Sequence, residues 1–429
     1  MQPTMPHEVP HLAIDASRMP LPELAAHRFD PSDGLDMTEV AMLAVVNNPD
    51  LRIARDEAGI ASAQAFAAGL LPDPQLNAAI GLPTNNIPGS NYTAFSYGLS
   101  YDIGALLARS SAKAAAAAGQ RKTDLNLLWQ EWQVVAQARL LFIRNLEQIR
   151  IMAILRENRD LLAASYSHAQ HALHDGNATL DAVSADFSAL QDMSRQINEL
   201  ERQQSQNRHD LNALLGLAPD VRLNLVGGSQ LSPLDTEKIV VELPTLDTRR
   251  PDLLALRAGY ESENERLRQA IIAQFPAPVV GLTRARDNTD VNSIGIGITM
   301  NLPLFNRNRG NVAIEEATRQ RLYDEFQARL NGAWSEIHRF LEDQELLERQ
   351  LAGVREDVAN AGRAAVAAEA AYREENITEF AYFTLRSALL GKRLEEITLE
   401  QKILEQRVAL QTLAGGEVPA KRSTTWCNP

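Results

Sequence analysis

Three histidines at three-residue spacing are the residues of this chain whose types and positions best suit chemistry. His168, His171 and His174 precede Asp175 near the end of a long polar stretch. Imidazole is a common ligand for zinc, cobalt, nickel and copper, so the group predicts a site for such cations. A solvated helix end is the alternative, because positions three apart drift around a helix and histidine suits the negative pole of the helix dipole.

Composition excludes several other kinds of chemistry. The single cysteine, Cys427, rules out a disulfide framework and a cysteine-based zinc site. No catalytic triad cue, His-Glu-x-x-His or phosphate-binding glycine loop is present, so we expect no enzyme activity and no cofactor. With 42 Lys and Arg against 55 Asp and Glu, the net charge is -13, and without a basic run we expect no nucleic-acid partner.

An internal repeat organises the elements that carry these residues. The segment Asn48–Arg52 recurs as Arg250–Leu254, and Leu71–Pro74 is echoed by Phe275–Pro278, a shift of about two hundred residues. Each half then reads as helix, strand, loop, strand, very long helix, short turn and second long helix. The chain is therefore predicted to contain the same structural plan twice.

Long helices dominate both halves. The stretch Ala105–Leu173 contains no proline, and at 1.5 Å per residue it can extend roughly 100 Å. Apolar residues within it follow the alternating spacing of three and four that marks a coiled-coil seam. They are Leu125, Leu128, Trp132, Val135, Phe142, Leu146, Ile149 and Ala153. We expect long antiparallel helical hairpins.

Four strands are predicted from alternation of apolar and small polar residues. They span Leu76–Leu82, Phe95–Ile103, Val279–Arg286 and Ile294–Leu302. One apolar and one small polar face suit a transmembrane β-barrel, but four strands cannot close one, since closure needs at least about eight. We therefore expect a barrel shared in a homo-oligomer. The alternative is a soluble coiled-coil scaffold capped by two hairpins.

Other membrane signals are absent from the sequence. No window of about 18 apolar residues predicts a transmembrane helix. Residues 1–28 carry five prolines and lack the charged-then-apolar pattern of an export signal.

Nearly the whole chain, about Leu35 to Gly415, resembles the TolC-like outer-membrane factors. The duplicated plan and the Pro-x-Pro entries carry this resemblance, and Leu302–Gly310 resembles the strand-to-helix motif of the CzcC-like heavy-metal branch. Its residues of interest are Pro303, Phe305, Asn306, Arg307, Asn308, Arg309 and Gly310. Pro303 would end strand pairing, Asn306 to Gly310 would permit the change of direction, and the two arginines would reach outer-membrane lipid headgroups.

The resemblance also implies a periplasmic tip at the far helix turns, where pump or adaptor docks and the closed duct narrows. Both turns resemble the family's Gly-x-x-Ser/Thr turn, although Glu375 replaces the usual glycine in the second. Many family members carry an acidic gate residue where this chain has alanine. The tip and gate candidates are therefore Gly176, Thr179, Asp181, Asp186, Thr378 and Glu379.

The resulting fold class is mainly α with β: helical hairpins forming a tunnel, plus four strands per chain in a twelve-stranded barrel of a homotrimer. We expect an extended segment at 1–36, a first repeat at 37–230 with its hairpin near 75–104, a second repeat at 231–415 with its hairpin near 279–303, and a tail at 416–429. The resemblance implies a passive outer-membrane duct with a periplasmic extension, exporting divalent cations with a resistance-nodulation-division pump and an adaptor. A duct for drugs or other small organic molecules is the alternative of the same fold.

Overall fold

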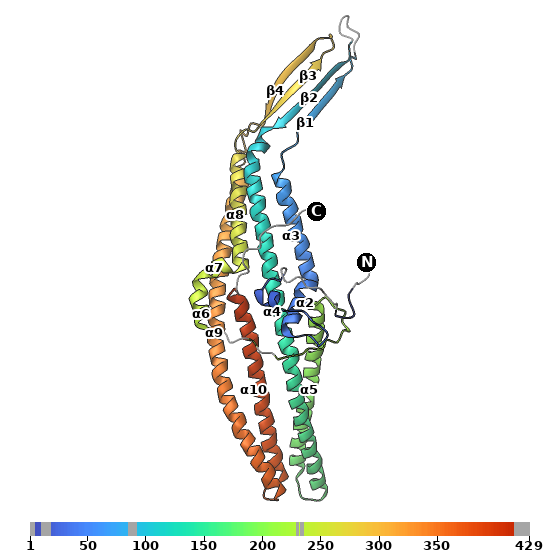
Figure 1. The fold of residues 1–429 in the computed structure, drawn as a ribbon, viewed down its shortest axis with the longest axis vertical. Helices are drawn as coiled ribbons and strands as arrows, with labels where there is room; N and C mark the ends of the chain where they lie inside the picture. The colour runs from blue at the N-terminus through green and yellow to red at the C-terminus, as the bar shows by residue number, and fades with distance from the viewer. Residues whose placement is uncertain (1–4, 10–18, 85–91, 229–230, 232–235, 416–429) are drawn as a thin grey trace. The chain divides into compact units, whose positions relative to one another are not determined.

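The computed structural model describes residues 5–9, 19–84, 92–228, 231 and 236–415. Two compact units divide the chain. Unit 1 comprises residues 1–53, 128–250 and 332–429, and unit 2 comprises 54–127 and 251–331. Each repeat expected from the sequence contributes to both units, because the longest helices begin in unit 2 and end in unit 1 (Figure 1).

The two halves of the chain contain corresponding helices and strands, as the internal repeat predicts. The first half contains α1 (Pro22–Ala26), α2 (Met37–Asn47), α3 (Pro49–Gly69), β1 (Gln75–Gly81), β2 (Ala94–Asp102), α4 (Ile103–His174) and α5 (Leu180–Leu214). The second contains α6 (Thr236–Glu242), the 3-10 helix η2 (Leu243–Thr245), α7 (Leu246–Arg249), α8 (Pro251–Ile272), β3 (Pro278–Arg286), β4 (Asn292–Met300), α9 (Arg309–Arg373) and α10 (Glu379–Leu413). Both copies of the repeated motif begin a helix on their proline, whose missing N–H costs nothing at a first turn.

The strands form one antiparallel sheet in the order β1-β2-β3-β4 (Figure 1). The two predicted hairpins are confirmed, and β2 pairs with β3 to join them, with Leu99 opposite Leu282. The predicted strands ended too late in three places. Leu82 lies beyond the end of β1, and Leu302 lies beyond the end of β4. Ile103 is the first residue of α4, where Asp102 accepts a hydrogen bond from Ala105 N.

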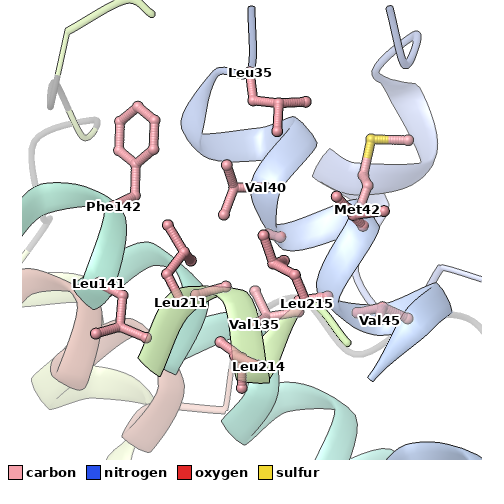
Figure 2. Packing of buried hydrophobic residues seen from close by; sticks show 14 of the residues in the cluster. Leu35, Val40, Met42, Val45, Val135, Leu141, Phe142, Leu211, Leu214 and Leu215 are labelled. Carbon is pink, nitrogen blue, oxygen red and sulfur yellow. The ribbon is translucent and has the colours of Figure 1, made fainter. Parts of the chain in front are cut away.

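The main core of unit 1 surrounds α2, which is apolar on all sides. Figure 2 shows Val40 and Val45 of α2 beside Val135 of α4, Leu211 of α5 and Leu215, which caps the end of α5. A helix apolar around its whole circumference must be enclosed by other elements. The paired helices α4 and α5 therefore close around α2.

Asparagines tie the end of α2 to this core. Asn47 Nδ2 donates to Leu215 O at 2.6 Å, and Asn48 Nδ2 donates to Leu214 O at 2.9 Å. Asn48 Oδ1 also accepts from Leu51 N at 3.0 Å, which caps α3. The repeated motif thus has a structural role in the first half of the chain.

Unit 2 contains a buried carboxyl group of α8 beside a half-buried one of α9. Glu263 is 5% exposed, and its Oε1 has no hydrogen-bond partner among the described residues. Its carboxyl group also shares a hydrogen bond with Glu315 of α9, and Arg266 Nη1 lies 3.9 Å from its Oε2. Burial and the neighbouring Glu315 raise the pKa of Glu263 to about 7.

None of the helices in the described residues combines the length and the apolar character that a bilayer-spanning helix needs.

Candidate functional site at the helical hairpin turns

The turns that join α4 to α5 and α9 to α10 lie at the same end of unit 1 (Figure 1). Both reverse the chain with one residue in the left-handed region: Gly176 at φ +76° in the first turn and Glu375 at φ +62° in the second. The amide of the next residue closes each turn, from Asn177 to Ala172 O at 2.7 Å and from Asn376 to Ala371 O at 2.8 Å. This is the hydrogen-bond pattern of a Schellman C-cap.

A threonine starts the returning helix in each hairpin. Thr179 Oγ1 accepts from Ala182 N at 3.4 Å, and Thr378 Oγ1 accepts from Ala381 N at 3.3 Å. Both N-caps predicted from the sequence are confirmed. Glu375 is strained where the first turn has glycine, because a Cβ disfavours positive φ.

The structure brings together two residues that the sequence suggested for different roles. His168 Nδ1 of α4, from the histidine group, lies 2.6 Å from Glu379 Oε2 of α10, from the gate candidates. Tyr372 of α9 donates its hydroxyl to Glu379 Oε1 at 3.1 Å, and this bond raises the pKa of the Tyr372 hydroxyl above its usual value. One carboxylate oxygen of Glu379 thus contacts α4, and the other accepts a hydrogen bond from α9.

The other candidates at this end lie apart from that contact. Asp186 Oδ2 accepts from Ser165 Oγ at 2.9 Å, which links α5 to α4 within the first hairpin. Asp181 is exposed in the first turn of α5. Among the described residues, the ligand atoms of His168, His171 and His174 are not close enough together to hold one metal ion, whereas those of His27, Asp36 and Glu39 are.

Ion pairs continue the link between α4 and α10 away from the turns. Arg386 Nη2 lies 3.0 Å from Glu157 Oε1, Arg150 lies 3.2 Å from Glu400, and Arg144 makes two bonds to Glu405 at 2.9 and 3.1 Å. A two-pronged Arg–carboxylate pair fixes direction as well as distance. His168 and Glu379 therefore form the contact nearest the turns in an antiparallel series that holds the two hairpins together.

The strand-to-helix motif lies in unit 2. Arg307 and Asn308 adopt positive φ, +48° and +50°, so they make the change of direction, while Gly310 is already inside α9. Asn308 Nδ2 donates to Ala270 O of α8 at 2.8 Å. Asparagine tolerates the left-handed region better than most residues, and here it also fastens the start of α9 to α8. Phe305 is 93% exposed.

Comparison with known proteins agrees with this arrangement of hairpins and sheet. The outer membrane efflux protein family matches residues 243–416. The pyoverdine export outer membrane protein OpmQ of Pseudomonas aeruginosa is 23% identical over 433 residues, which cover 92% of this chain and 90% of OpmQ. These matches confirm the resemblance to TolC-like outer-membrane factors, with the family match confined to the second half of the chain.

Solved structures of outer-membrane proteins share the fold of this chain. CusC matches with a TM-score of 0.71 at 18% identity, covering 93% of this chain and 97% of CusC. CmeC, an outer membrane channel of Campylobacter jejuni, matches with a TM-score of 0.75 at 18% identity, covering 90% of this chain and 87% of CmeC. VceC of Vibrio cholerae matches with a TM-score of 0.72 at 16% identity, covering 89% and 96%. The chain therefore has the fold of TolC-like outer-membrane proteins, and the family match and OpmQ support location in the outer membrane rather than a soluble scaffold.

Sequence reasoning missed the aromatic residues at the hairpin end of unit 1. Tyr372 stacks on Tyr382 with ring centroids 5.2 Å apart, and Phe383 meets the edge of the His168 ring at 6.1 Å. Tyr166 and Phe187 pack at 5.4 Å inside the first hairpin. A usable signal was present, because aromatics are only 5% of the chain and several fall beside the two turns.

Proposed function

We propose that this protein is the passive exit duct of a tripartite system that exports divalent metal cations. It would act as a homotrimer and dock at its hairpin turns with an inner-membrane resistance-nodulation-division pump and a periplasmic adaptor. It would convert no energy itself. The helices would continue the barrel as a tunnel through the periplasm, with outer-membrane lipid around the strands.

The observation that best supports a duct is the four-stranded sheet, which has β1 and β4 at its edges. An edge strand presents backbone N–H and C=O groups that lipid cannot satisfy, so each edge needs a partner strand. Pairing β4 of one copy with β1 of the next solves this for both edges. Three copies give twelve strands, within the range of outer-membrane barrels.

Two features favour a cation as cargo. The net charge of -13 favours positive ions along an enclosed path, and the strand-to-helix motif resembles that of the heavy-metal branch. An imidazole and a carboxylate also meet at the hairpin end, in His168 and Glu379, and both are groups that bind divalent transition ions. In this proposal Glu379 is the acidic gate residue, with Gly176, Thr179, Asp181, Asp186 and Thr378 shaping the turns around it.

The trimer is tested by electrophoresis of outer membranes with and without heating, followed by native mass spectrometry of the purified protein. A heat-sensitive band at three times the chain mass of 47.3 kDa supports the shared barrel. A monomer in mild detergent contradicts it.

The cargo is tested in the source cell by deleting the gene and restoring it on a plasmid. We expect deletion to lower tolerance to zinc, cobalt, nickel, cadmium or copper and to raise the cell content of that metal, with both restored by the wild-type gene. Unchanged metal tolerance together with lost drug tolerance would contradict the metal cargo and leave the duct intact.

Export of a small organic molecule is the second candidate, because the relative OpmQ is described as a pyoverdine export protein. Assaying siderophore and drug release from the same deletion strain separates the two cargo classes. Loss of siderophore release with normal metal content favours this candidate.

A further inference from the structure

A group of ligand atoms lies between α1 and α2, away from the hairpin turns. His27 Nε2 lies 3.3 Å from Asp36 Oδ2 and 3.9 Å from Glu39 Oε1, and all three ligand atoms are within 4.8 Å of one another. Two ligands of a tetrahedral zinc ion, each about 2.0 Å from the metal, lie about 3.3 Å apart. The spacing in this group is therefore close to that of a metal site before any adjustment.

Backbone amides already orient both carboxylates. Asp36 Oδ1 accepts from Glu39 N at 2.8 Å, while Glu39 accepts from Asp30 N at 2.7 Å and from Asp36 N at 3.0 Å. A carboxylate oxygen has two lone pairs, so Asp36 Oδ2 and one lone pair of Glu39 Oε1 remain for a ligand beside His27. Hydrogen-bonded carboxylates of this kind are the usual support of metal ligands.

The segment that carries the ligands is held in place on both sides. Leu24 and Leu35 are buried in the core of unit 1, at 0% and 2% exposure. Leu35 also exchanges backbone hydrogen bonds with the segment at Asn224 and Val226, at 2.8 and 3.0 Å. A metal would not need to gather its ligands from a flexible chain, so little ordering entropy opposes binding.

Charge and access also favour a cation. The two carboxylates carry about two negative charges, which outweigh the positive pole of α2, equivalent to about half a charge. Glu39 is buried, with 5% of its side chain exposed, while His27 and Asp36 are 35% and 38% exposed. An ion can therefore enter from the open side and keep water as a further ligand.

We propose that His27, Asp36 and Glu39 bind a first-row divalent transition cation such as Zn²⁺, fastening the segment before α2 to the start of that helix. The imidazole selects such ions over Mg²⁺ and Ca²⁺, which prefer oxygen ligands throughout. This site is independent of the exported cargo and lies apart from the histidines at the hairpin turns. The capping box of α2 already holds both carboxylates in these positions, so the ion adds to an existing arrangement.

The test is a titration of the purified, metal-free protein in detergent with Co²⁺, read by its visible absorption, and then with Zn²⁺ in competition. We expect one equivalent whose affinity falls at least tenfold in His27→Gln. Asp36→Asn should weaken it similarly while keeping the cap, since asparagine is as good an N-cap as aspartate. Glu39→Gln should also weaken it, although the glutamine amide can accept from only one of the Asp30 and Asp36 amides through its oxygen. Circular dichroism checks that each variant is folded.

Two controls separate this site from other histidines. His209→Gln removes an exposed histidine of α5 and should leave the affinity unchanged. A variant with glutamine at 168, 171 and 174 removes any binding at the hairpin turns and should also keep the equivalent that depends on His27. The proposal is overturned if no ion binds, or if the His27→Gln titration superimposes on those of wild type and His209→Gln.

Discussion

Glu263 offers a test of how a buried carboxyl group couples pH to stability. Its pKa rises from 4.5 to about 7 because it is buried beside Glu315. Below pH 4.5 the group holds its proton in both the folded and the unfolded chain, and its contribution to stability is fully present. Between pH 4.5 and 7 the unfolded chain releases the proton first, so that contribution shrinks, and above pH 7 it is lost.

The magnitude follows from the pKa difference of about 2.5. Each pKa unit corresponds to about 1.36 kcal/mol, so the free energy of unfolding should fall by about 3 kcal/mol as pH rises from 4.5 to 8. Glu263→Gln keeps the shape and removes the charge. We expect it to match wild type near pH 4.5 and to exceed it by up to about 3 kcal/mol at pH 8.

The assay is denaturant unfolding in detergent, followed by helical circular dichroism at pH steps from 4.5 to 8. Glu316→Gln, at an exposed position of α9, is the matched control and should stay within about 0.5 kcal/mol of wild type throughout. Infrared difference spectra between wild type and Glu263→Gln should show a protonated carboxyl band at pH 6 that disappears by pH 8. Stability curves of wild type and Glu263→Gln that run parallel over the whole range would refute the reasoning.

Three further predictions follow from the turns and junctions. Glu375→Gly should raise the free energy of unfolding by about 1 kcal/mol, and Gly176→Ala should lower it by a similar amount, because both positions have positive φ; opposite or absent shifts in denaturation midpoints would contradict the strain. Glu379→Gln weakens the contact with His168 and should increase entry of a large hydrophilic antibiotic into cells, whereas Asp181→Asn should not. Equal antibiotic sensitivity of cells with either variant would contradict the role of Glu379 as the gate residue. Asn308→Ala should lower the free energy of unfolding by about 2 to 3 kcal/mol, because it loses the hydrogen bond to α8 and places a Cβ residue without a polar side chain at positive φ. Asn308→Gly should lower it by about 1 kcal/mol, because only the hydrogen bond is lost. Matching denaturation midpoints for these two variants would show that φ is not strained there.

Elements whose signals are local were predictable from the sequence. The proline-free stretch Ala105–Leu173 became α4 at Ile103–His174, and both threonine N-caps were found where expected. Of the predicted coiled-coil residues, Trp132, Val135 and Phe142 are buried, whereas Ile149 is 62% exposed and Ala153 is also exposed, so the predicted seam is wrong at these two positions. Helix periodicity, capping and strand alternation each depend on neighbours within a few residues, which a single sequence displays directly.

The turn at the strand-to-helix motif shows how far local reasoning reaches. The change of direction falls within Asn306 to Gly310 as predicted, but the sequence did not show that the positive φ values lie on Arg307 and Asn308 while Gly310 lies within α9. Asn308 is held there by a carbonyl of α8, 38 positions away in the sequence. A distant partner therefore stabilises a backbone conformation that residue preferences alone disfavour.

The sequence by itself determined the order of helices and strands, the duplicated plan and the family to which they point. Only the tertiary structure decided which polar groups meet: His168 with Glu379, Glu263 with Glu315, and His27 with Asp36 and Glu39. Contacts such as Arg386 with Glu157 join positions 229 residues apart. Periodicity shows which face of a helix is polar, but the register between two packed helices depends on how their apolar side chains interlock, and that register selects the polar pairs.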